Sequence, residues 1–178
     1  KDLSKEDIRI LIINFIDGIF NKAVMQPIYC PYYVKFLNLL DNEYNILSLI
    51  NEKCNDYKKI LNKSPENTEL NDYDKFCQDN IDKVFKCGYS QFIGELFNNK
   101  MIEDDIIKEN LDLFVENLKE SVSLTDEILE NILICMSKLI STTSQKLKKQ
   151  NYKYDDIYNR INEIYNSYNK NKRIKFKL

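Results

Sequence analysis

The chain has 178 residues, of which 43% are apolar and 30% are charged, a composition typical of one globular domain and not of a disordered chain. It contains only three glycines and three prolines, so it lacks the frequent turn residues of sheet folds and predicts long helices. The 26 basic and 28 acidic residues nearly cancel, which excludes a general attraction to nucleic acid, and the absence of histidine excludes Ser-His-Asp catalysis and imidazole metal ligands.

Helix signals follow one another along the whole chain. Ser4 with Asp7 resembles a capping box, and Pro31 suits the first turn of a second helix. Apolar stripes at three- and four-residue spacing lie in residues 8–20, 36–40, 47–61, 76–85, 92–97, 106–118, 128–140 and 157–168. Residues 62–71 read as a polar loop, and Gly88 should break or bend the fourth helix.

The stripes also predict which side chains face the core. The residues expected to be buried in the second and fourth helices are Phe36, Leu37, Leu39, Leu40, Phe76, Cys77, Ile81, Val84 and Phe85. About eight to nine such helices form an all-α fold in a single domain over residues 1–178. Short links between the helices suit either a bundle or an α-solenoid of stacked helix pairs, and the pattern does not choose between them.

Cysteine usage and hydropathy indicate the cellular environment. The five cysteines form no C-x-x-C pair, so without histidine they predict reduced thiols and no metal site. Charged residues interrupt every apolar stretch before about 18 residues, so we expect no membrane segment. The chain starts at Lys1 without an initiator methionine, and we expect it to be a piece of a longer protein. No catalytic residue, cofactor or small-molecule substrate is indicated.

Two further clusters each have a structural and a functional interpretation. The twelve tyrosines mostly follow the helical stripes, which favours core or rim positions over base stacking. Lys146, Lys148, Lys149 and Lys153 form a small basic patch near an expected helix C-terminus. Interaction with the helix dipole explains that patch at least as well as a weak RNA-binding site does.

The C-terminal strip, residues 170–178, differs from the rest of the chain. Five of its nine residues are basic, and they alternate with Ile174, Phe176 and Leu178. One interpretation is a solvated closing helix whose apolar side chains cover the core. The other is a docking strip for an acidic protein surface or for phosphate. The residues alone favour neither.

Six segments, in order, resemble the middle domain of the eukaryotic translation initiation factor 4 gamma scaffold. The strongest is QFIGELFNNKMI at residues 91–102, which is similar to the family signature F-I-G-E-L-F-x-x-x-M-L. The C-terminal KRIKFKL at 172–178 is similar to R-I-K/R-F-x-L. The other four segments are IFNKAVMQP at 19–27, residues 31–40, LINEKCNDY at 49–57 and LISTT at 139–143.

The resemblance implies a crescent of stacked antiparallel HEAT-type helix pairs that performs no chemistry. It implies a cytoplasmic scaffold that binds the DEAD-box RNA helicase of initiation, factor 4A, and promotes its productive conformation. The cap-binding complex would be reached through the parent protein, and mRNA is a further partner. The family's helicase-binding surface maps onto Arg173, Lys175 and Phe176, and also onto Lys172, whereas Phe92, Leu96 and Phe97 match a packing signature.

Two departures from the family pattern affect these expectations. The family's first helix has no counterpart before Ser4, and an arginine-rich stretch of the family is replaced by VFKCGYS at residues 84–90, which weakens the expectation of RNA binding. Related middle domains serve in mRNA decay, splicing and poly(A)-protein regulation, so a scaffold in one of those processes is the closest alternative. Direct RNA binding is a second alternative, and an enzyme is the least favoured.

Overall fold

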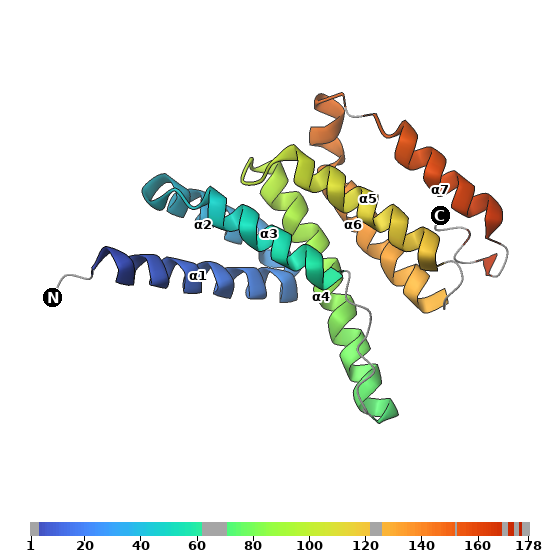
Figure 1. Ribbon diagram of the computed structural model, residues 1–178, viewed down its shortest axis with the longest axis horizontal. Helices are drawn as coiled ribbons and strands as arrows, with labels where there is room; N and C mark the ends of the chain where they lie inside the picture. Colours follow the sequence, from blue (N-terminus) through green and yellow to red (C-terminus); the bar gives the residue numbers. More distant parts are fainter. Residues whose placement is uncertain are drawn as a thin grey trace. The chain divides into compact units, whose positions relative to one another are not determined.

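The computed structural model describes residues 4–61, 71–121, 126–151, 153–168, 171, 172 and 175 (Figure 1). None of these residues is in a strand, which confirms the expected all-α class. The elements are α1 (Lys5–Met25), the short 3₁₀ helix η1 (Pro27–Tyr29), α2 (Cys30–Tyr44), α3 (Leu47–Leu61), α4 (Asp72–Asn98), α5 (Asp104–Ser121), α6 (Asp126–Lys149) and α7 (Asp155–Ser167). They form two compact units, Lys1–Ile102 and Glu103–Leu178.

The first helix begins as its sequence predicts. The Asp7 backbone N–H donates to Ser4 Oγ at 3.1 Å, and the Ser4 backbone N–H donates to the Asp7 carboxylate at 3.2 Å. The Ser4 hydroxyl also donates to that carboxylate at 2.6 Å. These hydrogen bonds stabilise the Asp7 anion and lower the pKa of its carboxyl group. The reciprocal capping box is therefore confirmed.

The core of the first unit is the contact between α1 and α4. The buried rings of Phe20 and Phe92 meet edge to face, with their centroids 5.0 Å apart. One turn further along α1, Val24 lies against Gly88, where a Cβ atom would come within 1.8 Å of the Val24 carbonyl oxygen. Phe20 meets Phe92, and Val24, which comes later in α1, meets Gly88, which comes earlier in α4. The two helices α1 and α4 therefore run antiparallel. The missing side chain of Gly88 is what allows the two backbones to approach this closely.

The predicted break at Gly88 is wrong. Helix α4 continues from Asp72 to Asn98 and unites the two helices expected on either side of that glycine. Seven α-helices are therefore present in the described part of the chain, where eight to nine were expected. A single glycine costs a helix only about 1 kcal/mol relative to alanine, and tight packing against α1 offsets that cost.

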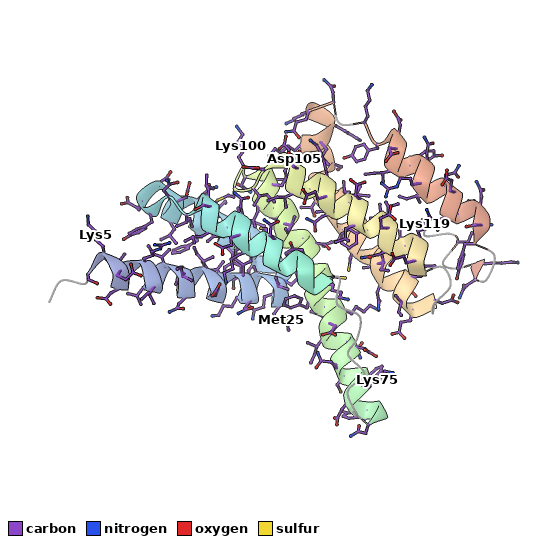
Figure 2. The ribbon with its side chains drawn as sticks, in the orientation of Figure 1. Lys5, Met25, Lys75, Lys100, Asp105 and Lys119 are labelled. Atoms are coloured by element: carbon purple, nitrogen blue, oxygen red, sulfur yellow. The ribbon has the colours of Figure 1, made fainter. Side chains whose placement is uncertain are left out.

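Burial along α2 and α4 differs from the predicted pattern. The side chains of Leu37 in α2 and of Phe92, Ile93, Leu96 and Phe97 in α4 are buried as expected. Leu39, Phe76, Phe36, Ile81 and Val84 were expected to be buried and are 66%, 64%, 44%, 49% and 46% exposed. Each apolar stripe is wider than the neighbouring helix can cover, and the first part of α4, which carries Lys75, extends beyond its contact with α1 (Figure 2).

Asp41 organises the connection between α2 and α3. Its Oδ1 accepts hydrogen bonds from the backbone N–H groups of Ile46 and Leu47, at 2.7 and 3.2 Å, at the start of α3. Asn45 ends α2 in the left-handed conformation, with φ 52°, and asparagine tolerates that conformation better than most residues. One carboxylate and one asparagine thus make a tight turn without glycine or proline.

Lys100 closes α4 in a conformation that favours glycine. Its φ is 62°, its N–H donates to Phe97 O at 2.9 Å, and the N–H of Met101 donates to Leu96 O at 2.9 Å, which is a Schellman motif. Because a β-carbon is strained there, we expect Lys100→Gly to raise the free energy of unfolding by about 1 kcal/mol, measured by urea denaturation. A variant that is less stable than the parent would contradict this assignment.

In the second unit, α5, α6 and α7 pack in an up-down-up order. Gln150 Nε2, just after α6, donates to Asp104 at the start of α5 at 2.8 Å, so these two helices run antiparallel. Tyr168, just after α7, bonds to Asp126 at the start of α6, so α7 is antiparallel to α6 as well. The buried residues follow the predicted stripes and include Leu111, Phe114, Leu118, Leu129, Leu133, Met136, Leu139, Ile157 and Ile164.

Candidate partner-binding site

Arg160 joins α7 to α5 on the solvent side of the second unit. Its Nη1 donates to Asp112 and its Nη2 to Glu116, both at 2.6 Å, and these two carboxylates lie one turn apart on α5. A longer contact of 3.4 Å reaches Asp156 on α7 itself. The fork of the guanidinium matches two acceptors at this spacing, which fixes how α7 lies along α5.

The end of α7 is held by the first residue of α6. Tyr168 Oη donates to Asp126 Oδ1 at 2.6 Å, and Asn171 Nδ2 donates to Asp126 Oδ2 at 2.9 Å. The Tyr168 side chain is almost fully buried, with 1% of the residue exposed. Burial, together with the hydrogen bond to the Asp126 carboxylate and its negative charge, raises the pKa of Tyr168 to about 12. The phenol therefore stays protonated at neutral pH and acts as a donor.

Two of the four predicted partner-binding residues are described, and they differ from each other. Lys172 is exposed, whereas Lys175 is half-buried. The Lys175 ammonium group lies 4.8 Å from the centre of the Tyr165 ring, within the range of a cation–π contact. Arg173 and Phe176 lie outside the described residues. Lys172 is thus the described lysine of the strip that a partner can reach with its whole side chain.

The four lysines of the predicted RNA-binding patch gather at the other end of α6. Lys146, Lys148 and Lys149 occupy its last turn, and Lys153 lies just before α7. All of them are exposed except Lys146, which is half-buried. A helix of 24 residues is about 36 Å long, so this patch and the Asp126 end are separated by roughly that distance. The structure therefore does not unite the two predicted basic sites.

Sequence reasoning missed Tyr165 and Asp126 as members of this region. Tyr165 was assigned to the apolar stripe, but it is 39% exposed and its ring meets Lys175. Asp126 is an acidic residue in the first turn of α6, a position that by itself indicates no distant partner. The pairing of Asp126 with Tyr168 spans 42 residues, so no local spacing in the sequence reveals it.

The other shifted pKa values have local structural causes. Burial raises the pKa of the Cys54 thiol and of the Glu95 carboxyl group. The Cys54 carbonyl also accepts a hydrogen bond from the buried Tyr89 hydroxyl at 2.9 Å. Within the described residues, no group of three or more Cys, Asp or Glu side chains is arranged to hold a metal ion.

No family model, curated protein or solved structure matches this chain. Within the described helices, no stretch has both the length and the apolar character that crossing a bilayer requires.

Proposed function

We propose that this chain is a non-catalytic scaffold domain of translation initiation that binds the DEAD-box RNA helicase, factor 4A. The observation that carries the proposal is the described part of the C-terminal strip. Lys172 is exposed there, and the Lys175 ammonium group lies over the Tyr165 ring. Both lysines follow the end of α7, which is held by a hydrogen bond to Asp126. This segment coincides with the R-I-K-F motif through which the resembled family contacts its helicase. An exposed lysine beside a helix end that is held in place suits an acidic protein partner.

The fold proposed for this function is a solenoid of HEAT-type helix pairs. Consecutive antiparallel helices occur in the second unit, α5 with α6 and α6 with α7, and such pairs are the building blocks of α-solenoids. The F-I-G-E-L-F segment contributes packing: Phe92, Leu96 and Phe97 are fully buried. A rigid surface of stacked helices can hold the two lobes of a helicase at a set distance.

The mechanism of such a scaffold is a shift of population. A DEAD-box helicase exchanges between splayed and closed arrangements of its lobes, and a scaffold promotes the cycle only if it binds the productive arrangement more tightly. The scaffold needs no reacting group for this. The cap-binding complex would be reached through other parts of the parent protein in the cytoplasm. A related middle-domain scaffold in mRNA decay, splicing or poly(A)-protein regulation is the alternative.

Calorimetric titration with the helicase tests the proposal. We expect Lys172→Glu/Arg173→Glu to weaken binding at least about tenfold, or about 1.4 kcal/mol, because it reverses two positive charges of the proposed binding segment. The matched control is Lys148→Glu/Lys149→Glu, which makes the same charge change at the other end of α6 and should leave the affinity unchanged.

Each contrary outcome has a definite meaning. If the unaltered chain does not bind the helicase, the proposed function is wrong. If it binds and the reversal at Lys172 and Arg173 has no effect, the site is wrong. If single-stranded RNA binds instead, with a steep salt dependence and a loss in the control variant, the basic patch at the end of α6 is an RNA site.

A further inference from the structure

The chain changes direction directly after α7 and then resumes a helical hydrogen bond. Tyr168 has extended backbone angles, φ −85° and ψ 116°, while its N–H still donates to Ile164 O at 2.9 Å. Further along, the Lys175 N–H donates to Asn171 O at 3.0 Å, the i to i−4 spacing of an α-helix. The predicted partner-binding residues are thus separated from α7 by a break, and the direction of α7 alone does not determine where they lie.

Asp126 supplies contacts on both sides of that break. One of its carboxylate oxygens accepts from Tyr168, the last residue before the break, and the other accepts from Asn171, the first described residue after it. Hydrogen bonds to an ionised carboxylate are stronger than those between neutral groups. The pair of bonds therefore fixes two points of the chain relative to the start of α6.

We propose that Asp126, Tyr168 and Asn171, here called the Asp126 clamp, are positioning residues that hold the backbone at Asn171 so that the adjacent Lys172 faces a partner. The proposal rests on the proposed function for the identity of the partner. The contact of Lys175 with Tyr165 acts in the same direction, because it holds the Lys175 side chain against a partly exposed ring of α7. Residues that are held in this way lose less conformational entropy on binding than free residues do.

Loss of a positioning residue should weaken partner binding and leave the fold stable, whereas loss of a structural residue should destabilise the fold. The Tyr168 ring is buried in the second unit, and its hydroxyl and the Asn171 amide are the groups that donate to Asp126. Removing these two donors while the buried ring is kept should release Asn171 and Lys172 and leave the core folded. Tyr168→Phe/Asn171→Ala removes both donors while it keeps the aromatic ring and the Asn171 carbonyl that accepts from Lys175.

Two measurements on the full chain test the clamp. The first is hydrogen exchange at the Lys175 amide without any partner, which we expect to become at least about fivefold faster in Tyr168→Phe/Asn171→Ala, while amides within α5 and α6 keep their rates. The second is helicase titration, where we expect about tenfold weaker binding. The matched control is Tyr158→Phe/Asn159→Ala, which removes the same groups from exposed positions on α7 and should alter neither readout.

The outcomes separate the clamp from the proposed function. Unchanged exchange at Lys175 would overturn the clamp, whatever the helicase does. Faster exchange with unchanged helicase affinity would overturn its positioning role. If the unaltered chain does not bind the helicase, the proposed function and the role of the clamp in it are both overturned. Faster exchange together with weaker binding, in this variant and not in the control, supports the proposal.

Discussion

Gly88→Ala is expected to lower the free energy of unfolding by about 3 kcal/mol, measured by urea denaturation. The new Cβ would lie 1.8 Å from the carbonyl oxygen and 2.7 Å from the carbonyl carbon of Val24, and both are backbone atoms. No change of rotamer can relieve that overlap, so α1 must move away from α4. Such a movement separates the buried rings of Phe20 and Phe92 as well.

Gly18→Ala is the matched control for this prediction. Gly18 also lies within a helix, but nothing is within 4 Å of the position that its Cβ would occupy. Alanine has a higher helix propensity than glycine, so this variant should gain about 0.5–1 kcal/mol. The two identical substitutions are thus expected to have opposite signs. A Gly88→Ala variant as stable as the parent would show that α1 and α4 do not pack as described.

Phe92→Ala is expected to cost about 3–5 kcal/mol of unfolding free energy, because it leaves a cavity the size of a phenyl ring in the core. Phe92 is 0% exposed and loses its edge-to-face contact with Phe20 at the same time. Phe76→Ala in the same helix is the control: Phe76 is 64% exposed, so its truncation should change stability by about 0.5 kcal/mol or less. Thermal and urea unfolding of both variants provide the measurement.

A contrary result would reassign the F-I-G-E-L-F segment. If Phe92→Ala kept its stability and lost helicase affinity, Phe92 would be a contact residue and not a core residue. If Phe76→Ala were as destabilising as Phe92→Ala, the exposed half of α4 would be covered in solution.

Local signals in the sequence predicted the helices well, because each signal depends only on residues that are close together along the chain. The capping box of Ser4 and the stripes of α5 and α6 are examples. The expected break at Gly88 was wrong because the reason for that glycine is its close contact with Val24, which lies 64 positions earlier. Leu39 and Phe76 were misplaced because a stripe shows which face is apolar and not how much of that face a neighbour covers.

The sequence predicted the residue composition of the candidate site but not the placement of its residues. Five basic residues in the strip were compatible with a binding segment or with a solvated closing helix, but the placement of Asn171 and Lys172 depends on the break at Tyr168 and on an acceptor 42 residues before Tyr168. The separation of the strip from the lysines at the end of α6 also follows from the packing of three helices. Residue spacing carries none of that information.

The contacts of Arg160 have a consequence for the register of α7. Packing of apolar side chains between two helices is similar after a shift of one helical turn, so it determines the axial position of a helix weakly. Partly exposed ion pairs contribute little to stability, yet a fork that meets Asp112 and Glu116 together selects one register. That choice determines whether Tyr168 arrives opposite Asp126. Arg160 therefore fixes the position along α5 at which α7 ends.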